Sequence, residues 1–152
     1  MYSTRRDIYF LTSRIIVNNA GYVVGVDKVG DLSLDNMEGM FATNVFGLIA
    51  LTQLFVKGEH LNPCLLQLSL TFVEFKKRKA GQIINLGSIA GVEAYAGGSI
   101  YCATKHAVNA FTTSLMKELV DTPIRVTEIQ PGKRLHLRSR VKLMLVTRYG
   151  RD

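Results

Sequence analysis

The sequence predicts an α/β fold in which a parallel sheet is flanked by helices. Short β-branched runs alternate along the chain with two long segments whose apolar residues recur at helical spacing. Turn-forming residues separate these segments. The order strand, helix, strand, helix, strand implies parallel pairing through right-handed crossovers. The chain of 152 residues is long enough for one domain with a substantial core.

The first predicted strand and helix lie in the N-terminal third. Ile15 to Val17 is a β-branched run, and the turn formers Asn18 to Gly21 end it. The apolar residues between Ser33 and Lys57 recur at helical spacing, which predicts a helix. Ser33 is a candidate N-cap, and Asp35 follows in the first turn, where the helix dipole favours negative charge.

Two further strands enclose the second helix. Gln82 to Leu86 is a β-branched run between two glycines. The segment from Ser99 to Val120 carries apolar residues along one helical face. Pro123 opens a third strand, Ile124 to Ile129, and Pro131-Gly132 ends it.

The net charge of +7 comes from the end of the chain. Residues 1–132 hold 12 Lys and Arg against 11 Asp and Glu, whereas residues 133–152 hold 7 against 1. The nearly neutral charge of residues 1–132 argues against a nucleic-acid-binding fold, and the concentration of basic residues in 133–152 indicates an atypical basic tail. Binding of nucleic acid or an acidic membrane through this tail is an alternative, disfavoured because Tyr149 is its only aromatic residue.

The cellular setting predicted by the sequence is cytoplasmic. Two cysteines, Cys64 and Cys102, cannot form a disulfide framework, which indicates a reducing compartment. No uninterrupted apolar run of 18 residues occurs, so no transmembrane helix and no membrane partner are expected. The charged start of the chain lacks the apolar core of a secretory signal.

A tyrosine and a lysine on the second helix indicate acid–base chemistry. Tyr101 and Lys105 are four residues apart and therefore share a helix face. A phenol is a poor acid–base catalyst at neutral pH, because its ordinary pKa is about 10, but a nearby ammonium stabilises the phenolate. Ser88 follows a strand end, where α/β proteins gather ligands. Taken alone, the pair is more simply interpreted as an exposed helical pair, since this spacing is common by chance.

Five motifs in a fixed order identify a family. They are Asn18-Asn-Ala-Gly21, Asn44, Ser88 within Gly-Ser-Ile-Ala-Gly, Tyr101-Cys-Ala-Thr-Lys105 and Pro131-Gly132. From Ile15 to Gly132 the chain resembles the classical short-chain dehydrogenase/reductase (SDR) family, which implies an incomplete Rossmann-like sheet. Residues 85–91 and 98–105 are most similar to the NADP-dependent 3-hydroxy acid (serine, allo-threonine) dehydrogenases.

The resemblance implies a role for each matching residue. The implied catalytic residues are Asn44, Ser88, Tyr101 and Lys105. Tyr101 would exchange the substrate proton, and Lys105 would stabilise the Tyr101 phenolate and hold the nicotinamide ribose. Ser88 would orient the substrate oxygen, and Asn44 would anchor a relay water. The implied cofactor-binding residues are Asn18, Ala20, Gly21, Tyr101, Lys105, Pro131 and Gly132. The implied reaction moves a hydride between NADP(H), or alternatively NAD(H), and a secondary alcohol or ketone, with a 3-hydroxy acid as a candidate. A small hydroxy or keto substrate and a homo-oligomer are the implied partners.

Several of these residues have a simpler interpretation when each is taken alone. Asn18 and Asn19 could be turn formers, Asn44 a surface residue of a helix, and Ser88 a cap of the following turn. The histidines His60, His106 and His136 have no metal-ligand spacing, so no metal is expected. Cys102 is expected to be a small buried residue rather than a nucleophile.

The N-terminal segment departs from the family pattern. The family places a G-x-x-x-G-x-G phosphate loop upstream of the Asn-Asn-Ala-Gly motif, but none of the 17 residues before Asn18 is glycine. Residues 1–14 are therefore an atypical segment, and residues 15–132 a partial, N-terminally truncated domain. Weak cofactor binding and impaired activity are expected. A non-catalytic remnant that pairs with a full-length relative is the alternative.

Two other segments depart from the pattern. Deleting residues 58–73, which contain Pro63, would place Phe75 four positions after Phe55 and continue the apolar helix face. These 16 residues are interpreted as an insertion, with a retained short intron as its hypothetical origin. The family threonine four residues after Pro-Gly is replaced by His136, so residues 133–152 are an atypical tail.

Overall fold

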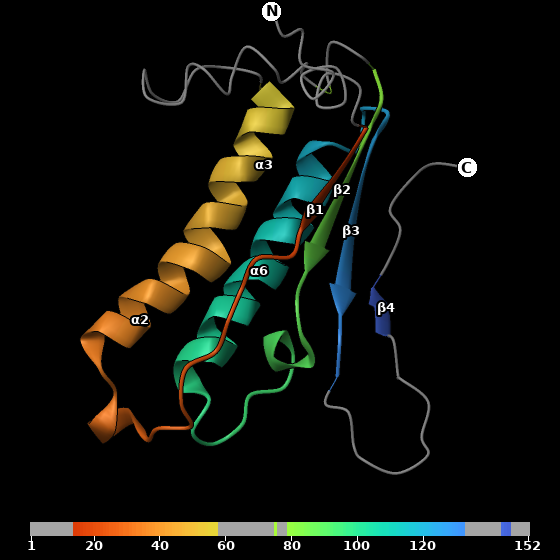
Figure 1. Cartoon of the computed structure of the whole chain (residues 1–152). Coiled ribbons are helices and arrows are strands. Elements are labelled where there is room, and N and C mark those ends of the chain that lie inside the picture. The colour runs from red at the N-terminus through yellow and green to blue at the C-terminus, as the bar shows by residue number, and fades with distance from the viewer. Residues whose placement is uncertain (1–13, 58–74, 76–78, 133–143, 147–152) are drawn as a thin grey trace, which may run out of the picture.

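The computed structural model describes residues 14–57, 75, 79–132 and 144–146, which form a four-stranded sheet with helices on one face (Figure 1). The strand order is β1-β2-β3-β4. Strands β1 (Ile15–Asn18), β2 (Gly81–Leu86) and β3 (Ile124–Gln130) are parallel neighbours. Strand β4 (Met144–Val146) pairs antiparallel with β3.

The helices match the two predicted helical segments, with one internal irregularity. Helix α2 (Leu34–Phe41) passes through a π-helical turn (Ala42–Gly47) into α3 (Leu48–Lys57), and α6 spans Ser99–Glu118. Short 3-10 turns cover Val29–Asp31 and Ile89–Gly91. Helices α3 and α6 lie side by side against the sheet, with α3 over β1 and α6 over β3 (Figure 1).

The predicted α/β class and its parallel sheet flanked by helices are confirmed, and the differences are local. The expected single helix contains a π-helical turn, which a regular apolar spacing does not reveal. Ser33 precedes α2 as expected, yet its side chain makes no capping bond; instead its carbonyl accepts from the Met37 N–H at 3.1 Å. Strand β4 was not predicted. The proposed insertion at residues 58–73 and nearly all of the two atypical end segments lie outside the described residues.

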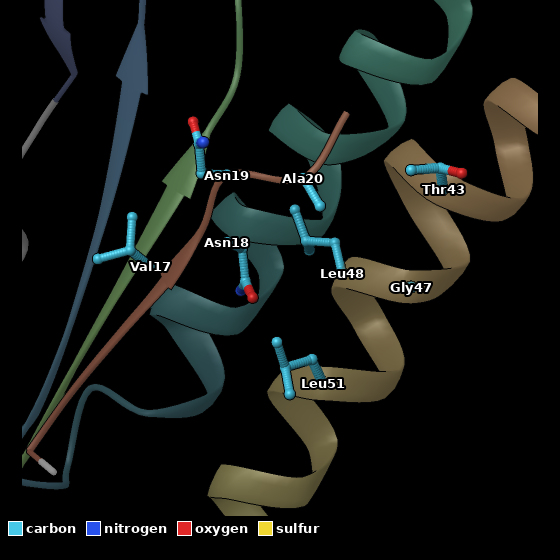
Figure 2. Close-up of a pocket in the computed structure, with 8 residues that line it drawn as sticks. All are labelled: Val17, Asn18, Asn19, Ala20, Thr43, Gly47, Leu48 and Leu51. Carbon is cyan, nitrogen blue, oxygen red and sulfur yellow. The ribbon is translucent and has the colours of Figure 1, made fainter. Parts of the chain in front are cut away.

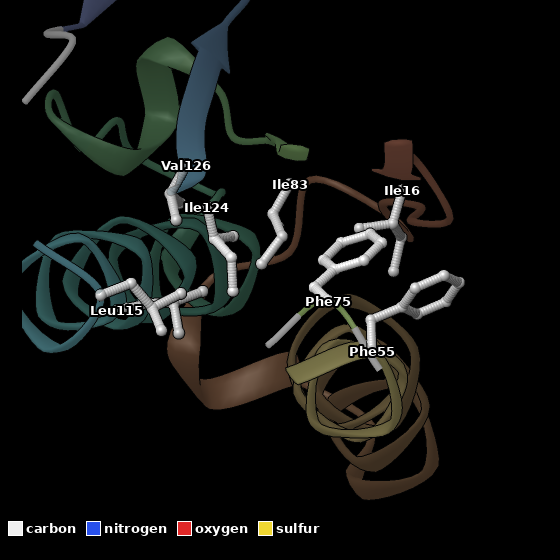
Figure 3. Packing of buried hydrophobic residues seen from close by; sticks show 8 residues of the cluster. Ile16, Phe55, Phe75, Ile83, Leu115, Ile124 and Val126 are labelled. Carbon is white, nitrogen blue, oxygen red and sulfur yellow. The ribbon is translucent and has the colours of Figure 1, made fainter. Parts of the chain in front are cut away.

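The hydrophobic core lies between the sheet and the helices (Figure 3). Alternate residues of each strand face it, as Ile16 and Ile83 do from neighbouring strands. Phe75 has no exposed surface, and its ring centroid lies 5.1 Å from that of Phe55. This tilted aromatic pair, visible in Figure 3, joins α3 to Phe75, which precedes β2 in the chain. The buried cluster consists of Ile16, Phe55, Phe75, Ile83, Leu115, Leu119, Ile124 and Val126.

The other face of the sheet is much more open. Ile15 and Val17 of β1 are 51% and 53% exposed, although both are apolar. Their neighbours in register, Gln82 and Ile84 of β2, are half-buried. The described residues therefore cover the sheet with helices on one face alone.

One helical segment, Leu34–Val56, is long and apolar enough to cross a membrane by length and composition, which the sequence analysis did not expect. In the fold, the segment packs on β1 and α6. It also buries two hydrogen-bonded polar side chains, Asn44 and Thr52. Both features are those of a helix in the layer beside a sheet.

Candidate active site

The predicted catalytic and cofactor-binding residues lie on elements that meet at one end of the sheet, with Asn44 in the π-helical turn. Strand β1 ends at Asn18, and β2 ends at Leu86 shortly before Ser88. The first turns of α6 carry Tyr101 and Lys105. Because β1, β2 and β3 are parallel, their carboxyl ends share one edge, which is where α/β folds bind ligands.

Lys105 is a buried lysine. Its side chain is 7% exposed, its Nζ donates to the Leu86 carbonyl oxygen at 2.8 Å, and Nζ lies 5.8 Å from the ring centroid of the half-buried Tyr101. Burial lowers the pKa of Lys105, and the negative charge of Glu128 acts in the opposite direction. The interpretation of an exposed helical pair is therefore wrong for Lys105.

Ser88 lies at the start of the 3-10 turn Ile89–Gly91, with 9% of its surface exposed. Its Oγ accepts a hydrogen bond from the Ala90 N–H at 3.1 Å, so Ser88 does cap the turn that follows it. A hydroxyl that accepts in this way still has a hydrogen to donate. The turn packs closely on α6, because a Cβ at Gly91 would lie 2.7 Å from the Lys105 carbonyl oxygen.

Asn44 lies in the π-helical turn and is 1% exposed, so the interpretation as a surface residue is wrong. Its Oδ1 accepts from the Tyr22 N–H at 2.9 Å, and its Nδ2 donates to the Tyr22 carbonyl at 2.9 Å. Nδ2 also donates to Thr104 Oγ1 at 3.1 Å, and that hydroxyl donates to the Tyr101 carbonyl at 2.8 Å. The side chain thus ties the turn after β1 to the first turns of α6.

Asn18 is 5% exposed, so it does more than end a strand. Its Nδ2 donates to Asn85 Oδ1 at 2.7 Å and to Thr52 Oγ1 at 3.0 Å. Asn85 Nδ2 in turn donates to Thr112 Oγ1 at 2.9 Å. This buried network joins β1, β2, α3 and α6, whereas Asn19 is exposed.

A cavity of about 220 Å³ opens between β1 and the π-helical turn (Figure 2). Asn18 lies on it, and the buried Oδ1 of Asn18 has no hydrogen-bond partner among the described residues. In Figure 2, the side chains of Asn18, Leu48 and Leu51 lie between the strand and the helix. The full lining is Val17, Asn18, Asn19, Ala20, Thr43, Gly47, Leu48 and Leu51.

The turn after the cavity passes close to the catalytic candidates. A Cβ at Gly21 would lie 3.1 Å from Asn44 Oδ1 and 3.6 Å from Lys105 Nζ. The Pro131 carbonyl accepts from the Ile89 N–H at 3.0 Å, which places this residue beside the turn that follows Ser88. Gly132 is exposed, and a Cβ there would meet nothing within 4 Å.

A buried acid, Glu128 of β3, also lies near this site and was not among the predicted site residues. Glu128 is 1% exposed, and Gln130 Nε2 donates to its Oε1 at 3.1 Å. Burial raises the pKa of Glu128, while the Gln130 and Asn109 side chains and the charge of Lys105 oppose that rise. A signal was present in the sequence, because Glu128 is in phase with the inward-facing Ile124 and Val126. Asn85 of β2 is likewise in phase with the inward-facing Ile83, whereas Thr104 had no comparable signal.

The described residues contain no group of three or more His, Cys, Asp or Glu side chains that could hold a metal ion. His106 is exposed, and its Nδ1 lies 2.8 Å from the Cys102 carbonyl oxygen. Cys102 is a free, buried thiol, as expected. His60, His136 and Cys64 lie outside the described residues.

Known proteins of similar sequence are dehydrogenases. The chain is 42% identical over 118 residues to the NADP-dependent 3-hydroxy acid dehydrogenase of Schizosaccharomyces pombe, covering 78% of this chain and 39% of that protein. It is 37% identical over 118 residues to the NADP-dependent 3-hydroxy acid dehydrogenase YdfG of Escherichia coli (strain K12), covering 78% of this chain and 41% of that protein. The chain thus spans about two fifths of the length of these curated relatives.

Solved structures and a family model agree with the sequence comparison. The crystal structure of serine dehydrogenase from Escherichia coli matches with a TM-score of 0.65 and 36% identity, covering 80% of this chain and 48% of the other. The closed form of serine dehydrogenase complexed with NADP+ matches with a TM-score of 0.63 and 37% identity, covering 78% and 41%. The short chain dehydrogenase family model matches residues 11–135, most of the chain. With the fold and the family model in agreement, the chain belongs to the short-chain dehydrogenase family.

Proposed function

We propose that this chain carries the catalytic half of an NADP(H)-dependent oxidoreductase that interconverts a secondary alcohol and a ketone. The observation that carries the proposal is the buried Lys105, whose Nζ lies 5.8 Å from the Tyr101 ring centroid and bonds to the carbonyl of Leu86, two residues before Ser88. A cation held beside a phenol in a water-poor site stabilises the phenolate, which makes a tyrosine a usable base.

The residues at the carboxyl end of β1 fit one part of the cofactor. The cavity of about 220 Å³ is smaller than the roughly 300–1,000 Å³ of pockets that hold a whole drug-sized ligand, so it would take a portion of a dinucleotide. Asn18 lines this cavity, and its buried Oδ1 has no hydrogen-bond partner among the described residues. Asn18, Ala20 and Gly21 would hold this portion, and Tyr101 and Lys105 the part nearest the reaction. When bound, NADP(H) would supply or accept the hydride.

The chain's own side chains would handle the proton and the substrate oxygen. Tyr101 Oη would give a proton to the carbonyl oxygen during reduction and remove it from the hydroxyl during oxidation. Ser88 would donate its free hydroxyl hydrogen to the same oxygen and orient it. Asn44 would fix the turn at Tyr22 and would anchor a relay water toward Lys105. Pro131 and Gly132 would contribute backbone contacts to the cofactor.

The relatives favour NADP(H) as the cofactor and a 3-hydroxy acid as the substrate. The Schizosaccharomyces pombe and Escherichia coli relatives are both named NADP-dependent 3-hydroxy acid dehydrogenases, and a similar serine dehydrogenase structure contains NADP+. We accordingly propose a cytoplasmic, homo-oligomeric enzyme that acts on a small hydroxy acid. For residues 1–152 taken alone we propose weak cofactor binding, since residues 1–17 contain no glycine with which to form a phosphate loop.

Turnover tests the proposed function directly. Purified protein is incubated with NADPH and a 3-keto acid, or with NADP+ and serine, and NADPH absorbance is followed. We expect Tyr101→Phe and Lys105→Met to reduce kcat/KM at least about 100-fold, the lower range for general acid–base catalysis. Lys117→Met removes an exposed lysine from the same helix and serves as the control. Turnover that survives Tyr101→Phe would refute the assigned chemistry.

A second candidate function is a non-catalytic partner of a longer relative. The exposed Ile15 and Val17 favour it, because an open apolar sheet face favours association. Size-exclusion chromatography of the chain mixed with a full-length relative separates the two candidates. Co-elution without NADPH turnover would support the partner, whereas turnover by the chain alone would support the enzyme.

A further inference from the structure

A buried carboxylate contacts the strand end that also binds Lys105, and no role proposed above uses it. Glu128 lies on β3, is 1% exposed, and accepts from Gln130 Nε2 at 3.1 Å. The Asn109 side chain, one turn beyond Lys105 on α6, also hydrogen-bonds to it. A carboxylate with two amide partners is held in one place, even though burial disfavours its charge.

The strand end Leu86-Gly87 brings Glu128 and Lys105 into the same neighbourhood. Lys105 Nζ bonds to the carbonyl of Leu86 at 2.8 Å. The next residue, Gly87, packs directly on Glu128, because a Cβ there would overlap Oε1. Both charged side chains therefore contact consecutive residues of one strand end, in a region from which water is largely excluded.

The charge balance around Lys105 depends on Glu128. On its own helix, Lys105 faces the phenol of Tyr101, which is neutral when protonated. The turn after β1 presents Gly21 and the turn after Ser88 presents Gly91, neither of which titrates, and β2 presents a backbone carbonyl. Burial lowers the pKa of Lys105, and Glu128 is the charged group that raises it. A buried ammonium without such a counter-charge would lose its proton more readily.

We propose that Glu128 is a positioning residue that acts through Lys105: its buried carboxylate keeps the Lys105 ammonium charged beside Tyr101. The inference deepens the proposed function and rests on it, since it explains how a desolvated lysine can remain a cation while stabilising a phenolate. Gln130 and Asn109 hold the carboxylate, and Gly87 leaves the room that it occupies.

The test measures the titration of Lys105 itself, without turnover. The 13Cε shift of Lys105 is followed with pH by NMR and assigned by its loss in Lys105→Arg. In Glu128→Gln we expect the pKa of Lys105 to fall by about one pH unit or more, as expected when a buried opposite charge is removed. Glu118→Gln removes an exposed carboxylate from the far end of α6 and should leave the titration unchanged.

Two further variants separate the role of charge from a role in packing. Glu128→Asp keeps the carboxylate, so the pKa of Lys105 should lie closer to that of the unmodified protein than it does in Glu128→Gln. Asn109→Ala removes one bond to the carboxylate and should lower the pKa of Lys105 by a smaller amount; it also serves if Glu128→Gln does not fold. An unchanged Lys105 titration in the folded Glu128 or Asn109 variants would overturn the inference. Loss of turnover in Tyr101→Phe tests the proposed function separately, so the two can fail independently.

Discussion

Near the site, the amide side chain of Asn44 forms the hydrogen bonds that a neighbouring backbone would otherwise form with Tyr22. Asn44 binds both the N–H and the carbonyl of Tyr22, each at 2.9 Å, as a neighbouring strand would. Because the chain after β1 has left the sheet, its backbone groups need partners from elsewhere. A single helical side chain supplies them and adds a bond to Thr104.

Removing this amide should destabilise the protein strongly. Asn44→Ala takes these bonds away from the backbone of Tyr22 and from the buried Thr104, so we expect the free energy of unfolding to fall by about 2–3 kcal/mol. Asn19→Ala, which changes an exposed asparagine just after β1, should change it by less than about 0.5 kcal/mol. Urea denaturation followed by circular dichroism measures both. Equal losses in the two variants would contradict the structural role of Asn44.

At the scale of elements, close packing between strand ends and side chains fixes the site. The end of β2 is followed by two small residues, Gly87-Ser88, and Gly87 lies on Glu128 of β3. Gly87→Ala should therefore lower the free energy of unfolding by about 1–3 kcal/mol, because neither the strand nor the buried carboxylate can yield freely. Gly30→Ala is the matched control, since a Cβ at Gly30 meets nothing within 4 Å. Thermal unfolding should separate the two variants by several degrees; a Gly87→Ala protein as stable as Gly30→Ala would mean that this contact is easily relieved.

The sequence predicted elements better than it predicted contacts within the site. Ile15 to Val17 and Ser99 to Val120 were recognisable because apolar periodicity and flanking turn formers are local properties of the chain. The π-helical turn could not be recognised in this way, since it shifts the helix by one residue without changing the composition of the segment. The bonds of Asn44 to Tyr22, 22 residues away, depend on tertiary packing that local spacing does not encode.

At the scale of the whole molecule, the helices among the described residues cover one face of the sheet, and apolar side chains are exposed on the other. Ile15 and Val17 expose more than half of their surface on β1, next to half-buried residues of β2. Exposed apolar sheet faces promote association. We expect the chain of 152 residues to self-associate at micromolar concentration, and the double variant Ile15→Thr/Val17→Thr, which retains β propensity, to increase the monomer fraction. Val29→Thr, at an exposed valine outside the sheet, is the control. Sedimentation velocity that shows the same association in all three proteins would place the contact elsewhere.

The buried charges of the site should also set how stability depends on pH. The pKa of Lys105 in the folded protein lies below its ordinary value of 10.5. At pH values between these two pKa values the unfolded chain binds more protons, so stability rises with pH up to about 10.5. The pKa of Glu128 in the folded protein lies above its ordinary value of 4.5. At pH values between these two pKa values the folded chain binds more protons, so stability falls as the pH rises through this range. Where both groups are charged, the burial of each opposes folding, and each is partly relieved by the charge of the other.

A double-mutant cycle at pH 7 tests this balance. Lys105→Met and Glu128→Gln each leave one buried charge without its counter-charge, whereas the double variant leaves neither. We therefore expect the double variant to be more stable than the two single effects predict when added, with a coupling of about 1 kcal/mol or more. Urea unfolding at about pH 7 measures the cycle, and repeating it at about pH 10 should show a smaller coupling, because less of the lysine then carries charge. Additive effects at both pH values would mean that the two groups do not interact, and the stability of the fold would then have to be explained without a charge pair at this end of the sheet.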